Sequence, residues 1–174
     1  MAIYEFNGIK PLIHPTAFVH PQACLIGKVI VEANCYIAPF ASLRGDFGAI
    51  EIGEGSNIQE SCTLHAKPGG TCRLAPNAHV GHGAIVHGSR VEQNCLIGMN
   101  AVVMDEVCIG ADSIIAASAF VKAGMVVPPK SLVAGLPATV IRVLNDAEIE
   151  QKSVATRRYQ LLAADCRRSL LLVG

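Results

Sequence analysis

The sequence contains no tryptophan, and aromatic residues make up only 5% of it. It also carries no net charge, because 14 basic residues balance 14 acidic ones, and no cluster of Lys and Arg stands out. A balanced chain without a basic patch has no field that attracts the phosphates of nucleic acid. We therefore expect no nucleic-acid partner.

Long hydrophobic runs are missing as well. Nowhere do about 18 apolar residues follow one another, which is close to the length that a membrane-spanning helix needs. The segment MAIYEFNGIK at 1–10 lacks the basic region and apolar run of a secretory signal. We expect a cytoplasmic protein with no membrane association. The length of 174 residues suits one domain.

Paired cysteines are also absent. The chain has 7 cysteines, an odd number, and no C-x-x-C pair. Disulfides and a thiolate zinc site are therefore poorly supported, and we expect the thiols to be small buried hydrophobic groups. Cys62 alone is close in sequence to a residue considered below, His65. The cysteines are Cys24, Cys35, Cys62, Cys72, Cys95, Cys108 and Cys166.

Aliphatic residues, by contrast, recur every six positions, with a few short insertions. A helix needs spacings of three and four, and an antiparallel strand alternates with period two, so neither explains this pattern. The period of six predicts an all-β solenoid, a left-handed parallel β-helix of hexapeptide repeats over residues 1–128; the alternative is a β-sandwich with accidental spacing. The repeat positions are Ile13, Val19, Leu25, Val31, Ile37, Leu43, Ile52, Ile58, Leu64, Leu74, Val80, Val86, Val91, Ile97, Val103, Ile109, Ile115, Val121 and Val127.

Three stretches lie outside the repeat. Residues 66–73 interrupt it and predict a loop, and the proline-containing residues 129–144 predict a connecting segment. Asn145 followed by Glu148 resembles a capping box, which predicts a helix within 145–174 that ends near Leu170 and packs on the solenoid. We expect Ile149, Leu161, Leu162 and Cys166 to make the contact, and Glu150, Lys152, Arg157 and Arg158 to be solvated.

The repeat register relates three side chains to one another. His65 and His87 each follow an inward aliphatic residue, and once the insertion is subtracted they are one coil apart. Arg44 lies one coil before His65 in the same column. Imidazoles stacked in this way can share one metal ion. His82 lies on another side of the coil, so it can complete such a site only from a neighbouring subunit, which suggests a three-fold assembly.

The alternative is that these histidines are ordinary solvated surface residues. His14 and His20 are one repeat apart and hence on different faces, so they are expected to be surface or structural residues. His79 precedes the inward Val80. The register does not decide whether it supports a metal site from behind the ligands or is a polar residue without a role in binding.

At these positions the chain resembles the γ-class carbonic anhydrase-like family of hexapeptide-repeat proteins. Within that family it is most similar to the subgroup of the phenylacetate-degradation protein PaaY and the carnitine-operon protein CaiE. The matching segments are LRGDFG (43–48), NIQESCTLH (57–65), VGHGAIVHG (80–88), IGMNAVVMDEVCIG (97–110), ASAFVKAG (117–124) and GLPATVIR (135–142).

The resemblance implies a zinc ion at the interfaces of a homotrimer, held by His65 and His87, with His82 donated by the neighbouring subunit. It also implies an Arg44–Asp46 ion pair across the subunit interface; the alternative is a plain structural pair of the same two residues. The remaining site residues that it implies are Gln59 and Asn57 near the metal-bound water and Tyr159 directed at the site.

Two positions depart from the efficient carbonic anhydrases of this family. Where those enzymes carry glutamates that move protons, this chain has Phe47 and Pro68. Hydration of CO2 to bicarbonate must export a proton in each turnover, whereas thioester hydrolysis can rely on water and buffer. On this ground, and because the resemblance to PaaY implies hydrolysis of a CoA thioester in phenylacetate or other aromatic catabolism, we rank a PaaY-type zinc-dependent thioesterase first and carbonic anhydrase second.

Two further alternatives remain open. A hexapeptide-repeat acyltransferase would use one histidine as a general base and would need no metal. A zinc-containing trimer without activity would serve as a scaffold. Three imidazoles would also accept Fe2+ or Co2+ in place of Zn2+.

Overall fold

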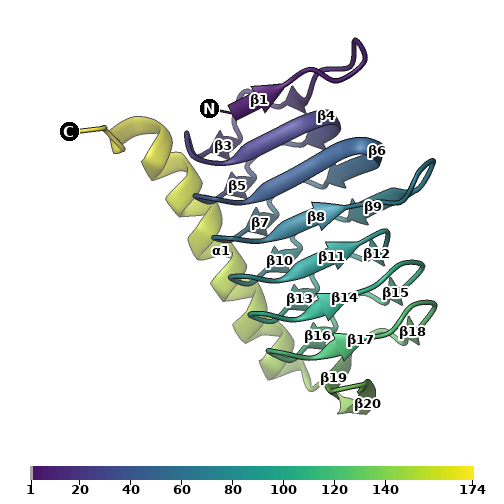
Figure 1. The fold of residues 1–174 in the computed structure, drawn as a ribbon. Coiled ribbons are helices and arrows are strands. Elements are labelled where there is room, and N and C mark those ends of the chain that lie inside the picture. The colour runs from purple at the N-terminus through teal and green to yellow at the C-terminus, as the bar shows by residue number, and fades with distance from the viewer. Residues whose placement is uncertain (1) are drawn as a thin grey trace.

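A computed structural model describes residues 2–174 of the chain, in which a triangular solenoid is followed by one helix (Figure 1). The parallel pairing and the coil repeat confirm the predicted left-handed β-helix. Each coil contributes a short strand to each of three faces, and the inward aliphatic residues of successive coils stack into one continuous core.

Two of the three faces form one 12-stranded sheet because the long strands β4 and β6 continue around a corner. Its other strands belong to one face or the other. On one face β6 is followed by β8, β11, β14 and β17, and on the other by β9, β12, β15 and β18. The members are β1 (Ala2–Tyr4), β2 (Leu12–Ile13), β4 (Cys24–Val31), β6 (Ser42–Ile52), β8 (Thr63–His65), β9 (Thr71–Leu74), β11 (Ile85–His87), β12 (Arg90–Val91), β14 (Val102–Val103), β15 (Cys108–Ile109), β17 (Phe120–Val121) and β18 (Val126–Val127).

The third face is an 8-stranded sheet. Its strands are β3 (Phe18–Val19), β5 (Tyr36–Ile37), β7 (Asn57–Ile58), β10 (His79–Val80), β13 (Leu96–Ile97), β16 (Ile114–Ile115), β19 (Ser131–Gly135) and β20 (Ala138–Val143). All neighbours in it are parallel except the terminal pair β19 and β20. The corners of the solenoid use left-handed backbone, often at asparagine, as at Asn77 with φ of 61° and Asn94 with φ of 56°.

Two of the predicted boundaries differ from the structure. The insertion is shorter than residues 66–73, because 71–73 already belong to β9. The segment 129–144 is not a simple connector, since β19 extends the parallel sheet through β16 and then forms a hairpin with β20. Pro128 and Pro129 precede this hairpin, and Pro137, whose preceding peptide bond is cis, lies in its turn.

The predicted C-terminal helix is present as α1 (Asp146–Ser169), and Asn145 and Glu148 form the predicted capping box. Its predicted contact face was right only in part: Cys166 packs against the buried cluster of Phe18, Tyr36, Ala38 and Ala163, and Ile149 is half-buried. Leu161 is 68% exposed and Leu162 is 39% exposed, whereas Lys152, Thr156 and Ala163 are buried against the solenoid.

Lys152, predicted to be solvated, instead places its Nζ atom 2.8 Å from Asn94 Oδ1 and also contacts the carbonyl oxygen of Asn77. The helix is thus anchored by hydrogen bonds to the corner as well as by apolar contact. Within residues 2–174, no helix is long and apolar enough to cross a membrane.

Candidate metal centre

The predicted column of Arg44, His65 and His87 is present on one face of the solenoid. Arg44 on β6 pairs with His65 on β8, and His65 pairs with His87 on β11. This confirms the register deduced from the repeat, including the correction for the insertion. Because the preceding residues Leu43, Leu64 and Val86 point into the core, the three polar side chains point outward.

The two imidazoles of this column face each other. His65 Nδ1 lies 3.0 Å from His87 Nε2, and the ring centroids are 5.1 Å apart. Two nitrogens that bind one zinc ion tetrahedrally at about 2.0–2.1 Å lie about 3.3 Å from each other. The donor pair therefore fits a shared ion with a small adjustment of the rings.

Carboxylates lie behind both rings. His65 Nε2 is 3.2 Å from Asp46 Oδ1, and His87 Nδ1 is 2.9 Å from Asp105 Oδ1. The atoms of the second pair are close but are not aligned as a hydrogen bond. A carboxylate favours a proton on the ring nitrogen that it faces, which leaves the lone pair on the other nitrogen. Two lone pairs would then face each other across 3.0 Å, an arrangement that a cation between them stabilises.

Asp46 is held in place from several directions. Arg44 donates to its Oδ2 over 3.1 Å, and the backbone N–H of Phe47 donates to its Oδ1 over 2.9 Å. Burial alone would raise the pKa of Asp46, but the contacts with His65 and Arg44 hold it below its usual value. The Arg44–Asp46 pair forms within one chain; its place at a subunit interface stays a prediction.

Asp105 approaches His87 because the residue after that histidine is Gly88. A Cβ on Gly88 would overlap with Asp105 Oδ1, and Gly88 also has a positive φ of 51°. Any other side chain at position 88 would displace the carboxylate from the imidazole.

The third predicted ligand, His82, lies in the turn between β10 and β11. Its Nδ1 is 2.6 Å from Glu60 Oε2, and its side chain is half exposed. The Nδ1 atom of His82 therefore also faces a carboxylate, which leaves Nε2 as the nitrogen that could bind a metal ion. No three His, Cys, Asp or Glu side chains within residues 2–174 come together in a single chain as a metal site.

Asn57, Gln59 and Tyr159 do not join the His65–His87 pair within the chain. They lie with His79 on the 8-stranded sheet and α1, beside His82. Gln59 Nε2 donates to Asn57 Oδ1 over 3.0 Å and lies 2.6 Å from His79 Nε2, and the ring of His79 meets Tyr159 edge-on. Burial lowers the pKa of His79 to about 4, so this imidazole is neutral at pH 7.

The structure thus places these residues in two separate clusters on one chain. We call Arg44, Asp46, His65, His87 and Asp105 the paired-histidine half-site. We call Asn57, Gln59, Glu60, His79, His82 and Tyr159 the corner half-site. Glu60, Asp105 and the contact of His79 with Gln59 were missed from the sequence. Glu60 could have been found, because Glu60 and His82 each lie two positions after an inward aliphatic residue, one coil apart.

The two positions that depart from the efficient carbonic anhydrases lie on and near the paired-histidine half-site. The ring of Phe47 lies 5.6 Å from that of His65, and the Arg44 guanidinium is 5.9 Å from the same phenyl ring. Pro68 is exposed in the short loop before β9. Neither side chain can carry a proton.

The thiols do not take part in this arrangement. All 7 cysteines are free, and burial raises the pKa of Cys62 to about 11. Four are buried as expected, whereas Cys108 is exposed. A neutral, buried Cys62 is neither a nucleophile nor a ready metal ligand at pH 7.

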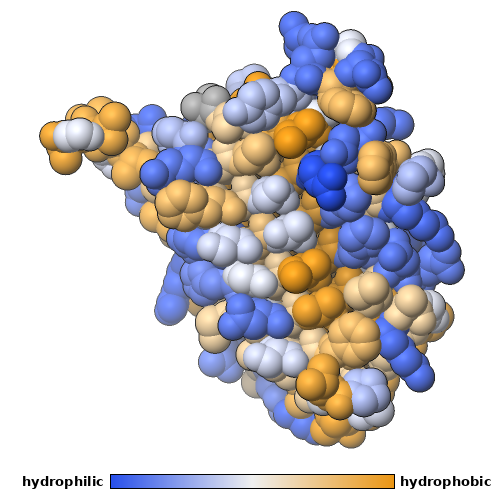
Figure 2. Space-filling view, in the orientation of Figure 1, coloured by the Kyte–Doolittle hydropathy of each residue, from blue (hydrophilic) through white to orange (hydrophobic). Residues whose placement is uncertain are grey.

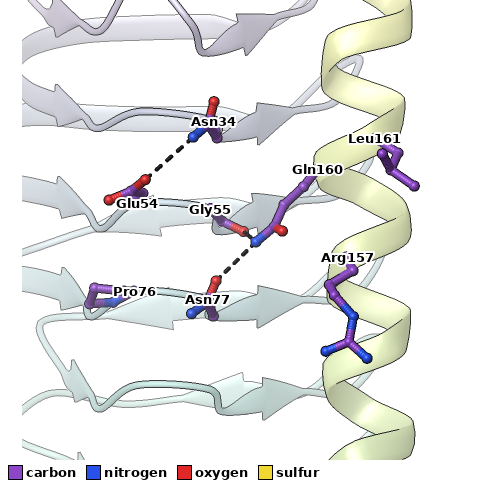
Figure 3. A pocket seen from close by; sticks show the side chains of 8 residues that line it. All are labelled: Asn34, Glu54, Gly55, Pro76, Asn77, Arg157, Gln160 and Leu161. Atoms are coloured by element: carbon purple, nitrogen blue, oxygen red, sulfur yellow. Dashed lines mark hydrogen bonds between the residues drawn. The ribbon is translucent and has the colours of Figure 1, made fainter.

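A pocket of about 540 Å³ lies elsewhere, between α1 and the adjoining corner (Figure 3). Gln160 spans it by donating to the carbonyl oxygen of Gly55 over 3.0 Å and to Asn77 Oδ1 over 2.9 Å. None of the six histidines lines this pocket, and its hydrogen bonds hold the helix to the coils.

Comparison with known proteins agrees with this architecture. The family model described as bacterial transferase hexapeptide (six repeats) matches residues 88–123. A hexapeptide transferase family protein of Anaplasma phagocytophilum superposes with a TM-score of 0.88 at 30% identity, over 93% of this chain and 96% of that one. A candidate acetyltransferase of Bacillus cereus superposes with a TM-score of 0.92 at 31% identity, over 94% and 95%.

Closer relatives are found among curated sequences. The chain is 48% identical to carnitine operon protein CaiE of Salmonella agona over 98% of this chain and 86% of the relative. It is 46% identical to the protein of the same name from Escherichia coli K12, over 98% and 87%. These similarities confirm the resemblance inferred from the motifs, and the chain belongs to the CaiE family of hexapeptide-repeat proteins.

Proposed function

We propose that this protein is a cytoplasmic, metal-dependent thioesterase that hydrolyses a CoA thioester. In this proposal it acts as a homotrimer, with zinc held by His65 and His87 of one subunit and His82 of the next. The observation that carries the proposal is the carboxylate behind each of the three imidazoles. A solvated surface histidine needs no such partner, whereas a metal-binding histidine nearly always donates its other ring N–H to a carboxylate, a backbone carbonyl or a water.

A zinc ion held by three neutral imidazoles supplies a Lewis acid and lowers the pKa of a bound water to about 7. The chain's own residues prepare that environment. Asp46, Asp105 and Glu60 hold protons on the outer ring nitrogens, so the inner nitrogens keep their lone pairs. Tyr159, whose pKa is raised by burial, stays a neutral phenol beside His82, where it can donate a hydrogen bond to a substrate carbonyl.

An apolar ladder beside the paired histidines supports the trimer. Ile85, Val102 and Phe120 pair in register on β11, β14 and β17, and Ile85 is 40% exposed. Figure 2 shows hydrophobic residues gathered along this part of the face. Exposed apolar surface next to an incomplete site is what an interface that brings the two half-sites together would require.

Carbonic anhydrase activity is the weaker candidate on chemical grounds. Phe47 and Pro68 cannot carry the proton that CO2 hydration releases, and the phenyl ring instead lies against His65. An acyltransferase is favoured by the descriptions of the structurally similar proteins. It would need one histidine base, however, and would leave the mutual approach of His65 and His87 without a role.

Single His→Ala variants at positions 65, 82 and 87 distinguish these functions when bound zinc and CoA-thioester hydrolysis are both measured. The proposal predicts that all three lose zinc and activity to a similar degree, because each removes one ligand of one site. His14→Ala is the matched control. A transferase with one histidine base predicts a severe loss of activity for one of the three variants and mild losses for the other two. A scaffold predicts bound zinc and no turnover in the wild type.

A further inference from the structure

A groove of about 440 Å³ adjoins His82, and its walls change from polar to apolar along its length. We call it the Tyr159 groove. It lies on the outer surface of the 8-stranded sheet, next to the residue of α1 that gives it its name. The residues that define it are Gln59, His79, His82, Leu96, Ile114 and Tyr159.

The floor of the Tyr159 groove follows one column of the repeat. His79 on β10 pairs with Leu96 on β13, and Leu96 pairs with Ile114 on β16. Leu96 and Ile114 are half-buried, although side chains at the same column positions in earlier coils, Phe18 and Tyr36, are covered by α1. The helix thus leaves this part of the column open.

The polar end of the groove has unused hydrogen-bonding capacity. His79, which lines the groove, is 8% exposed, and no group in residues 2–174 pairs with its Nδ1. Buried polar atoms of this kind are uncommon and call for a partner such as a ligand or an ordered water.

The size and polarity of the groove select the kind of ligand. Pockets of about 300–1,000 Å³ with apolar walls and a few polar groups at one end are typical of small-molecule sites. Two strand spacings of about 4.8 Å separate His79 from Ile114, roughly the reach of an extended chain of eight carbons. His82, which the proposed function places at the subunit interface, lines the polar end of the groove.

We propose that the Tyr159 groove binds the acyl chain of the substrate, so that this protein prefers medium-length aliphatic acyl groups. The thioester carbonyl lies at the polar end beside His82, Gln59 and Tyr159, and the hydrocarbon extends over Leu96 to Ile114. This inference rests on the proposed thioesterase function for its biological meaning, but binding to the groove can be measured without turnover.

The test uses S-alkyl thioethers of coenzyme A, which cannot be hydrolysed, with ethyl, butyl, octyl and dodecyl chains. Isothermal titration of the wild-type oligomer should give a dissociation constant that falls two- to fourfold, roughly, for each methylene up to about eight carbons and then levels off. Ile114→Glu should weaken S-octyl-CoA by about tenfold or more and S-ethyl-CoA by less than about twofold.

Val126→Glu is the matched control, because Val126 is 72% exposed on β18, on a different face. Ile114→Ala is a second variant that removes apolar contact without adding a charge. The melting temperature and light scattering of each variant show whether it is folded and assembled like the wild type. Affinity independent of chain length, or equal effects of the Ile114 and Val126 variants, would overturn the inference. So would dissociation of the oligomer by Ile114→Glu, which would show that a second copy covers the groove. Length-dependent binding without hydrolysis would retain the inference and refute the thioesterase.

Discussion

Replacement of Asp46 by Asn tests the role of the carboxylates behind the histidines. An amide at this position is uncharged, so it favours a proton on His65 Nε2, which lies 3.2 Å from Asp46 Oδ1, less strongly than the carboxylate does. Loss of such a partner costs metal sites about 10- to 100-fold in affinity, or about 1.4–2.7 kcal/mol. We expect a loss in the lower part of this range. Arg44, whose Nη1 lies 3.1 Å from Asp46 Oδ2, loses its carboxylate partner in this variant, but its guanidinium is partly solvated, so water limits the effect of its unpaired charge on the site.

Zinc affinity of Asp46→Asn is measured by competition with a chromogenic chelator at fixed pH. Glu106→Gln is the matched control, since Glu106 is an exposed carboxylate that pairs with Lys67 rather than with a histidine. Asp105→Asn should weaken zinc similarly through His87. Equal zinc affinities for Asp46→Asn, Glu106→Gln and the wild type would refute the reasoning that the carboxylates prepare the ligands.

Three further predictions concern assembly, proton transfer and helix docking. His82→Ala should lower both the zinc content and the fraction of trimer in light scattering, and an unchanged trimer that keeps one zinc per chain would contradict donation from the neighbouring subunit. Phe47→Glu combined with Pro68→Glu should raise any rate of CO2 hydration in weak buffer and leave thioester hydrolysis little changed; an unaltered hydration rate would show that proton transfer is not what the native chain lacks. Burial lowers the pKa of Lys152 to about 8 from 10.5, so between these values the unfolded chain binds more protons and this residue makes stability rise with pH. The free energy of unfolding by urea, measured at pH 8 and pH 9, should rise more with pH for the wild type than for Lys152→Met. Subtracting the two proteins cancels the titration of the buried thiols. A difference in unfolding free energy that does not change with pH would contradict the prediction.

The solenoid and the histidine column could be predicted because both follow from one period. A six-residue repeat fixes which side chains point inward, and equal coil lengths then bring Arg44, His65 and His87 into one column. The insertion near position 70 did not obscure this, since residues added between coils leave the register on either side intact. The capping box was equally readable, because its two hydrogen bonds involve residues three positions apart.

The packing of α1 could not be read in the same way. Lys152 is buried because the corner presents acceptors at Asn77 and Asn94, and these become neighbours of the helix only after the whole solenoid has formed. Hydrophobicity alone assigned the contact to Leu161 and Leu162, which are exposed. Asp105 was missed for a related reason: its approach to His87 depends on the absence of a side chain at Gly88, in a turn outside the strand register.

The measurement that tests the central claim most directly is CoA-thioester hydrolysis on a single preparation before chelation, after chelation and after zinc is added back. Our account predicts activity that is lost with the metal and restored by about one zinc ion per chain, the stoichiometry of a three-histidine site shared between neighbours. Full hydrolysis by protein shown to contain no metal would contradict it.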